Sequence, residues 1–189
     1  MHTKKLFTTK KIVLTALMAA LTVVGSYIRV VLPLDIAGTT AFHLGNIMCA
    51  LSGILLGPWL GALAAGLGSA MYDILNPLYI SEAWITFLMK GAYGLAVGLV
   101  VCSGRKPWSH GKALLGTCVG AAVYAVLYLA KSFFYSGMLL HGLSAEAAML
   151  TVVGKLPATA FNAAVAIIFA PILGVALRTA LKKARLFLE

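Results

Sequence analysis

Acidic side chains are scarce in this chain, and their scarcity already narrows the class of protein. Asp and Glu account for only five of 189 residues, against fifteen Lys and Arg, and charged residues make up 11% of the sequence. A soluble domain carries about 25% charged residues. With 61% hydrophobic residues and a mean hydropathy of +0.98, the composition instead predicts an integral membrane protein.

Motifs for catalysis and cofactor binding are also missing. The sequence has no GxxxxGK[ST] phosphate loop, no HExxH pair and no paired carboxylates in its apolar segments, so a general acid/base mechanism has little to work with. Cys49, Cys102 and Cys118 lie on separate apolar segments without CxxC spacing, which favours buried thiols over a disulfide or metal site. We expect no catalytic residue, no cofactor and no bound metal.

Six apolar segments follow one another along the chain. At about 20 residues per membrane crossing, residues 1–189 leave room for a single transmembrane domain and no separate soluble one. The class is all-α, with six transmembrane helices separated by breakers such as Pro33 and Gly57-Pro58. We expect these helices at about 11–32, 43–57, 59–76, 84–103, 112–137 and 148–181.

Most of the basic residues predict how these helices are oriented. Eleven of them lie in the N-terminal tail, in the loop between the fourth and fifth helices, and at the C-terminal end, which six crossings place on one side. By the positive-inside rule that side is the cytoplasm of a prokaryotic cell, and both termini lie there. The net charge of +10 is therefore interpreted as topology and contact with anionic lipid, not as nucleic-acid binding.

The remaining basic residues, Arg29, Lys90, Lys131 and Lys155, lie within or at the ends of apolar segments, where a charge is costly and tends to be functional. The three lysines come from three different helices, and each lies roughly 10 Å below the expected outer surface at a rise of about 1.5 Å per residue. A shared depth favours convergence on a polar cavity. The alternative is that each lysine snorkels separately to the headgroups.

Other polar and aromatic side chains share this half of the membrane. An excess of Lys over carboxylates suggests a ligand with an anionic or acceptor-rich group, and aromatic rings can stack on a flat ligand. A structural pair of Lys with Asp, or an interfacial aromatic belt, would explain the same residues. Besides the three lysines, the candidate substrate-binding residues are His43, Asn46, Tyr72, Asp73, Asn76, Trp84, Tyr93, Tyr128 and Tyr135.

Small residues recur at spacings of four. The series Gly57, Gly61, Ala65 and Ser69 lines one helix face and lets helix backbones approach closely, which favours internal packing. Ala16 and Ala20 form a similar pair on the first helix. That pair is either an internal seam or a docking surface for another membrane protein.

Several of these stretches together resemble a known family. The chain is similar to the S components of energy-coupling factor (ECF) vitamin transporters, in the riboflavin-type and hydroxymethylpyrimidine- or pyridoxine-type subgroup. The resemblance covers residues from about 10 to 180. It rests on the Ala16-xxx-Ala20 pair, Gly38-Thr39-Thr40-Ala41-Phe42-His43-Leu44-Gly45-Asn46, Gly66-Leu67-Gly68-Ser69-Ala70-Met71-Tyr72-Asp73-Ile74-Leu75, and Trp84-Ile85-Thr86-Phe87-Leu88-Met89-Lys90-Gly91.

The resemblance implies a six-helix bundle that captures a micronutrient from outside the cell. Such a subunit associates with a membrane coupling (T) subunit and two cytoplasmic ATPases, and it topples in the membrane to release its cargo. The family's AxxxA docking pattern carries over to Ala16 and Ala20. The loop at about 33–42 would act as a lid.

Two other classes of function stay open at this point: a stand-alone channel or secondary carrier, and an intramembrane enzyme. A requirement for ATPase subunits during uptake would separate them from the transporter subunit. Among substrates, few acidic residues and no His-rich N-terminus disfavour a nickel or cobalt ion. Pyridoxine or its phosphate, the pyrimidine precursor of thiamine, and riboflavin are not distinguished by the sequence.

Overall fold

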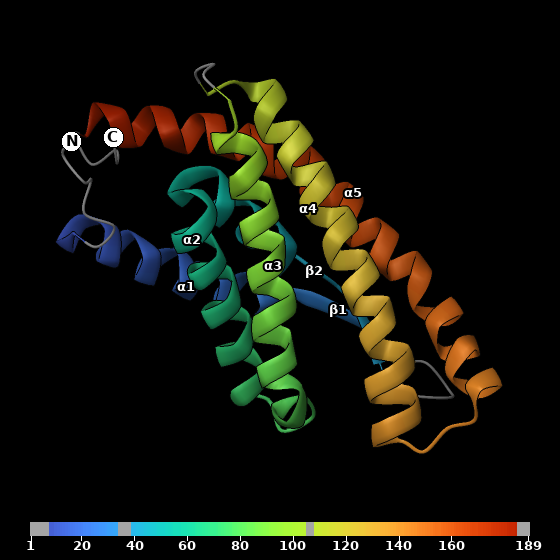
Figure 1. Ribbon diagram of the computed structural model, residues 1–189. Helices are drawn as coiled ribbons and strands as arrows, with labels where there is room; N and C mark the ends of the chain where they lie inside the picture. Colours follow the sequence, from blue (N-terminus) through green and yellow to red (C-terminus); the bar gives the residue numbers. More distant parts are fainter. Residues whose placement is uncertain (1–7, 34–38, 105–107, 185–189) are drawn as a thin grey trace.

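The computed structural model describes residues 8–33, 39–104 and 108–184. Helices dominate, with one short pair of strands near the N-terminus (Figure 1). In chain order the elements are α1 (Thr9–Tyr27), β1 (Arg29–Pro33), β2 (Thr39–His43), α2 (Gly45–Ile74), the 3-10 helix η1 (Ile80–Glu82), α3 (Ala83–Cys102), α4 (His110–Lys131), the π-helix η2 (Ser132–Leu140) and α5 (Ala145–Lys183).

Within the described residues, five helical spans are long and apolar enough to cross a membrane. This confirms the predicted class, a largely helical membrane protein. The spans number five and not six because α2 includes both segments that the sequence predicted as helices over 43–57 and 59–76.

The break inside α2 lies at Gly57. Its φ of 78° and ψ of −170° are not helical, and they belong to a region that Gly enters far more readily than other residues. A Cβ atom on Gly61 would lie only 2.7 Å from the Cα of Gly53 and the carbonyl oxygen of Ser52, so the arms on either side of the break are in direct contact. α2 is therefore a helical hairpin held by small residues.

The same small residues bring α2 against α3. A Cβ on Gly53 would lie 2.6 Å from the Gly94 carbonyl oxygen, and one on Gly94 would lie 2.6 Å from the Gly61 carbonyl oxygen. Backbones at this distance leave no room for a side chain, as expected at small-xxx-small seams. α2 and α3 therefore form the tightly packed centre of the molecule (Figure 1).

The N-terminal region differs from the sequence prediction. The helix expected over 11–32 ends at Tyr27, and the chain continues as β1, which pairs antiparallel with β2 in a register that places Arg29 opposite His43. The run Arg29–Pro33 contains two valines and a proline, which suits a strand as well as an apolar helix. Residues 34–38 of the predicted lid lie outside the described residues, while its last residues belong to β2.

A second difference concerns the helix expected over 112–137. α4 ends at Lys131, and η2 continues directly from it to Leu140. The other helix ends lie close to the predicted positions, except that α5 begins at Ala145, three residues before the predicted start at 148.

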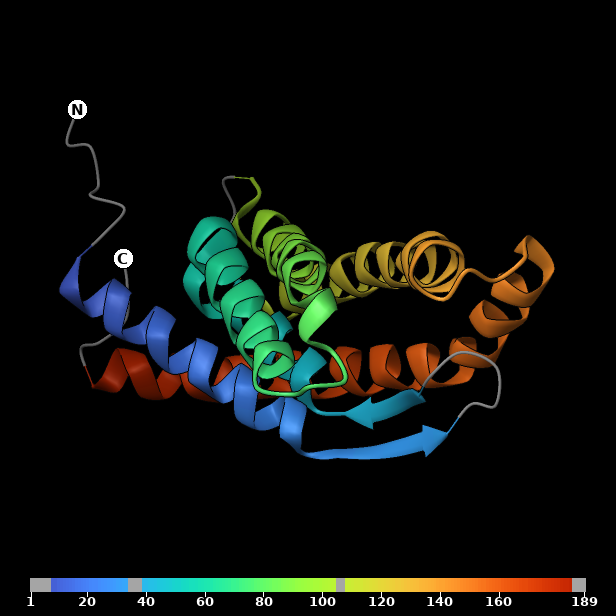
Figure 2. The same ribbon diagram turned by 90° about the horizontal axis from the view of Figure 1, so that it is seen from below.

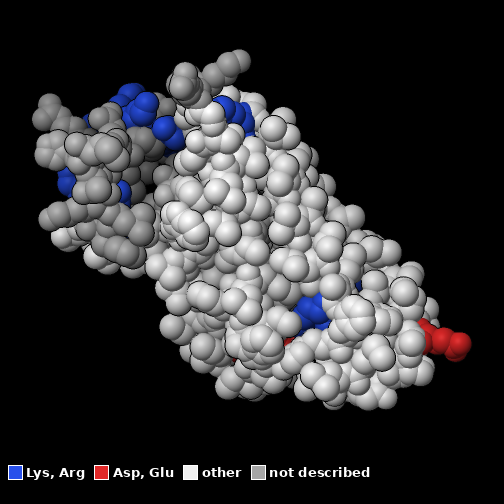
Figure 3. Space-filling model, in the orientation of Figure 1, with Lys and Arg blue, Asp and Glu red and all other residues white. Residues whose placement is uncertain are grey.

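The helices are arranged so that the two ends of the molecule differ in charge. Figures 1 and 2 show the start of α1 and the end of α5 on the same side of the molecule, with α5 and the β-hairpin on the opposite face from α3 and α4. Figure 3 shows blue atoms gathered near the termini and a second, small blue group in a depression between α3 and α4. This second group lies at the candidate site described below.

Candidate functional site

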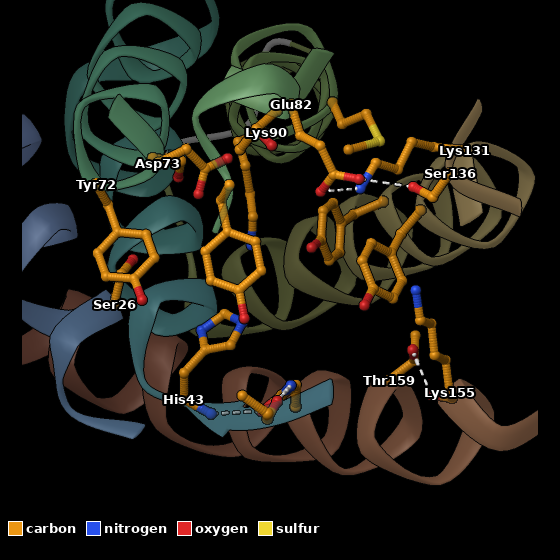
Figure 4. A pocket seen from close by; sticks show the side chains of 18 of the residues that line it. Ser26, His43, Tyr72, Asp73, Glu82, Lys90, Lys131, Ser136, Lys155 and Thr159 are labelled. Carbon is orange, nitrogen blue, oxygen red and sulfur yellow. Dashed lines mark hydrogen bonds and ion pairs between the residues drawn. The ribbon is translucent and has the colours of Figure 1, made fainter. Parts of the chain in front are cut away.

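A cavity of about 340 Å³ lies between the β-hairpin and the ends of the helices that are remote from the termini. Every strand and helical element contributes to its wall (Figure 4). The lining residues are Ser26, Arg29, Ala41, His43, Asn46, Ser69, Tyr72, Asp73, Leu78, Tyr79, Glu82, Thr86, Met89, Lys90, Tyr124, Tyr128, Lys131, Ser136, Leu140, His141, Lys155, Thr159 and Asn162.

The three intramembrane lysines line this one cavity. Lys90 from α3, Lys131 from the end of α4 and Lys155 from α5 are exposed by only 6%, 8% and 6%. A snorkelling lysine would instead extend its ammonium group toward the headgroups. The arrangement therefore matches convergence on a polar cavity.

Two of these lysines have close polar partners. The Lys90 ammonium donates a hydrogen bond to Asn46 Oδ1 and lies 3.9 Å from the centre of the Tyr124 ring. The Lys131 ammonium lies 2.5 Å from Glu82 Oε2, and the other carboxylate oxygen of Glu82 accepts a hydrogen bond of 2.7 Å from Ser136 (Figure 4). The Glu82 contacts tie the segment before α3 to the π-helix η2.

The other two cations of the cavity lie against aromatic rings. The Arg29 guanidinium lies 5.2 Å from the ring centres of both Tyr72 and Tyr79. The Lys155 ammonium lies 5.9 Å from the ring of Tyr128, and within the described residues no carboxylate forms an ion pair with it. Cation–π contacts of this kind stabilise a buried charge only partly.

The β-hairpin is fixed to α5 by the side chain of Asn162 and by an edge-to-face ring contact, in which the centres of Phe42 and Phe161 lie 4.6 Å apart. Asn162 Oδ1 accepts a hydrogen bond of 3.0 Å from the His43 backbone N–H, and Asn162 Nδ2 donates one of 2.8 Å to the Ala41 carbonyl oxygen. The amide thus satisfies two backbone groups at the edge of β2, in place of a further strand. Through this anchor the hairpin holds Arg29 and His43 at the cavity.

His43 is the least solvated titratable group of the hairpin. Its Nδ1 atom is buried and has no hydrogen-bond partner among the described residues. Burial, and then the nearby charges of Lys90 and Arg29, lower the pKa of His43 from 6.5 to about 3, so the imidazole is neutral at physiological pH. A Cβ on Gly45 would lie 3.1 Å from this ring, which explains the small residue at that position.

Eight of the twelve predicted substrate-binding residues line the cavity: His43, Asn46, Tyr72, Asp73, Lys90, Tyr128, Lys131 and Lys155. The other four do not. Asn76 donates a hydrogen bond to the Tyr72 hydroxyl from outside the wall, and Tyr93 is fully buried behind Tyr124 with its ring stacked on it. Trp84 is 57% exposed and contacts Tyr135, whose hydroxyl donates to the Ser81 carbonyl oxygen.

Several lining residues were not among the sequence candidates. Tyr124 lies four residues before Tyr128 on the same face of α4, a spacing that the sequence displays. Asn162 and Thr159 lie on a long apolar helix, where a polar residue signals an internal partner. Glu82 lies between the helices predicted at 59–76 and 84–103, so it was placed in a loop and not among the binding candidates. Within the described residues, no three His, Cys, Asp or Glu side chains cluster as a metal site.

A second feature lies on α1, outside the cavity. Thr15, Met18 and Thr22 are buried against the rest of the protein, whereas Ala16 and Ala20 are on the exposed face of the helix. The small-xxx-small pair is therefore not an internal seam among the described residues. It leaves a shallow surface on which another helix can approach closely.

Comparison with known proteins agrees with the family resemblance found in the sequence. A family model described as "ECF-type riboflavin transporter, S component" matches residues 6–179. The chain is 32% identical over 118 residues to an uncharacterized protein in gap 3'region of Pyrococcus woesei, covering 62% of this chain and 74% of that protein. It is 34% identical over 94 residues to a UPF0397 protein of Streptococcus gordonii, covering 50% of this chain and 48% of that protein.

Proposed function

Since the chain belongs to the family of ECF-type riboflavin transporter S components, we propose that it is the high-affinity substrate-binding subunit of an ATP-driven importer. Its cargo is a water-soluble vitamin or vitamin precursor with a flat heteroaromatic ring, of the riboflavin, pyridoxine or hydroxymethylpyrimidine kind. The observation that carries the proposal is the cavity, in which buried lysines and tyrosine rings face the same space.

The size of the cavity supports a small cargo. Ligand pockets in proteins range from about 300 to 1,000 Å³, and at about 340 Å³ this one lies near the lower limit. Its aromatic wall offers stacking surfaces, and its amide, hydroxyl and ammonium groups offer hydrogen bonds that fix the orientation of a polar ring.

The proposed topology follows from the charge distribution. The basic residues at the ends of α1 and α5 lie on the cytoplasmic side of a prokaryotic plasma membrane, and the cavity lies toward the opposite, outer side. In this orientation the subunit collects its cargo from outside.

The proposed partners are a membrane coupling subunit and two cytoplasmic ATPases. The exposed pair Ala16 and Ala20 is the docking surface for the coupling subunit, because two helices meet closely where both present small side chains. ATP hydrolysis occurs in the partners, and the chain itself has no catalytic role. A stand-alone carrier or an intramembrane enzyme is the alternative, and a requirement for ATPase subunits during uptake separates the two cases.

A binding panel on the purified protein tests the proposal. Riboflavin, pyridoxine, hydroxymethylpyrimidine, thiamine, folate, pantothenate and biotin are titrated while tryptophan fluorescence is followed. We expect a dissociation constant in the nanomolar range for one heteroaromatic compound, weakened at least tenfold by Lys90→Ala. An unchanged affinity in Lys90→Ala, Lys131→Ala and Lys155→Ala would refute the assignment of the cavity as the binding site.

A further inference from the structure

The charges that line the cavity do not balance. Four cationic side chains face it, namely Arg29, Lys90, Lys131 and Lys155. Two carboxylates, Asp73 and Glu82, face it as well. The difference of four and two is an excess of two positive charges in an enclosed space, where unpaired charge is costly.

The positive charge without a carboxylate partner is concentrated at the end of the cavity that Lys155 borders. Glu82 pairs with Lys131, and Asn46 accepts from Lys90, whose neighbourhood also includes the Asp73 carboxylate. The Lys155 ammonium has a ring face at 5.9 Å and, among described residues, no carboxylate in ion-pair contact. Figure 4 shows Lys155 extending from α5 toward the wall that carries Lys131, so two ammonium groups border the same region of the cavity.

A stack of tyrosine rings leads to this end. Tyr93 stacks on Tyr124 at 5.7 Å between ring centres, and Tyr124 stacks on Tyr128 at 5.7 Å. Tyr124 and Tyr128 line the cavity, and each lies under one lysine, Lys90 and Lys155 respectively. A flat ring bound against Tyr128 therefore lies beside the Lys155 ammonium group, which a substituent at the edge of the ring can reach.

We infer that the cargo is a flat heteroaromatic compound with an anionic substituent, a carboxylate or a phosphate monoester, that pairs with Lys155. The inference rests on the proposed function and narrows its substrate class. A phosphate monoester carries about −1.5 to −2 charges at pH 7 and would match the excess closely. A carboxylate would match half of it.

The test compares compounds that differ only in this charge. Nicotinate is measured against nicotinamide, pyridoxine 5'-phosphate against pyridoxine, and riboflavin 5'-phosphate against riboflavin, by calorimetry on the full-length protein in detergent. We expect the anionic member of at least one pair to bind about 10- to 100-fold more tightly, as for a buried hydrogen bond to a charged group. The nicotinate and phosphate pairs separate a carboxylate ligand from a phosphate ligand.

Substitutions test whether Lys155 is the residue that favours the anionic compound. Lys155→Met keeps the length of the side chain and removes its charge, so it is expected to abolish the advantage of the anionic compound over its neutral partner. Lys155→Arg is expected to retain the advantage. Lys112→Met is the matched control, because Lys112 is at the far end of α4 and contacts the Ser103 carbonyl oxygen, away from the cavity.

The outcomes separate this inference from the proposed function. Tight binding of a neutral compound with no gain for its anionic partner overturns the anionic class and leaves the vitamin-binding role intact. An anionic advantage that survives in Lys155→Met overturns the assignment of that residue. If none of the six compounds, nor any compound of the wider panel, binds to folded protein, both proposals fail. Should Lys155→Met not fold, the paired comparison on the wild-type protein still decides the charge of the cargo.

Discussion

Replacing Asn162 by leucine is expected to weaken the attachment of the β-hairpin to α5, leaving the ring contact of Phe42 with Phe161 as its remaining support. The substitution keeps the approximate size of the side chain but removes both atoms that contact β2. The His43 N–H and the Ala41 carbonyl oxygen then lose their partners. Because the hairpin carries Arg29 and His43 to the cavity, its weaker attachment should also weaken ligand binding.

The size of the effect follows from the two bonds. A buried polar group left without a partner costs about 1–3 kcal/mol. Both contacts of Asn162 are only partly buried, so water can reach the freed groups, and we take about 1–3 kcal/mol for the pair together. Every 1.4 kcal/mol corresponds to about a factor of ten, so local opening of β2 should become roughly 5- to 150-fold more frequent.

Hydrogen exchange measures this opening directly. A peptide covering residues 39–46, followed by mass spectrometry, should exchange faster by that factor in Asn162→Leu than in the wild type. Thr179→Val on the same helix is the control, since the Thr179 hydroxyl is exposed and bonds only to the Val175 carbonyl oxygen of its own helix in the described structure. Unchanged exchange of this peptide in Asn162→Leu would show that the amide does not anchor the hairpin.

Three further outcomes are expected. Ala20→Trp should abolish uptake by cells that express the whole transporter but leave ligand binding by the purified subunit unchanged, whereas Val126→Trp, a control at another exposed position, should change neither uptake nor binding. Normal uptake by Ala20→Trp counts against the docking surface. Glu82→Gln leaves the buried ammonium of Lys131 unpaired and should lower the free energy of unfolding by about 3–5 kcal/mol. The double substitution with Lys131→Met should largely reverse this loss if burial of the lone charge is its cause, and a double variant as unstable as Glu82→Gln would refute that cause. The folded-state pKa of His43, about 3, lies below its ordinary value of 6.5, so only the unfolded chain binds this proton as the pH falls below about 6.5. Between pH 7 and 5 the free energy of unfolding of the wild type should therefore fall by about 2 kcal/mol more than that of His43→Gln. Parallel curves of stability against pH for the two proteins would refute this.

The convergence of the three lysines on one cavity could be predicted from the sequence, because charge is rare in apolar segments and each lysine's distance from the end of its helix can be counted. In the structure all three, Lys90, Lys131 and Lys155, line the same cavity. The direction in which each side chain faces around its helix axis was harder to predict. Trp84 and Tyr135 have a similar depth but contact each other outside the cavity wall.

The β-hairpin could not be predicted from local sequence. Residues 29–33 are apolar enough to continue a helix, and the partner that favours the strand pair, Asn162, is more than one hundred residues away. The preference for a strand depends on such surroundings more than on intrinsic propensity. The anchor residue itself is visible in the sequence only as one amide within an apolar helix.

The join of α4 to η2 has a consequence for how the cargo could change during evolution. In η2 the N–H of His141 bonds to the Ser136 carbonyl oxygen five residues earlier, one residue more than in an α-helix. Because a π-turn takes up one residue more than an α-turn, loss of a single residue within 132–140 would restore α-helical bonding there, shift the side chains inside this segment and leave the chain beyond it facing as before. Ser136 would then move relative to Glu82 and the cavity wall without being replaced. Among related chains, a change of cargo is therefore expected to accompany insertions and deletions in 132–140 as well as replacements.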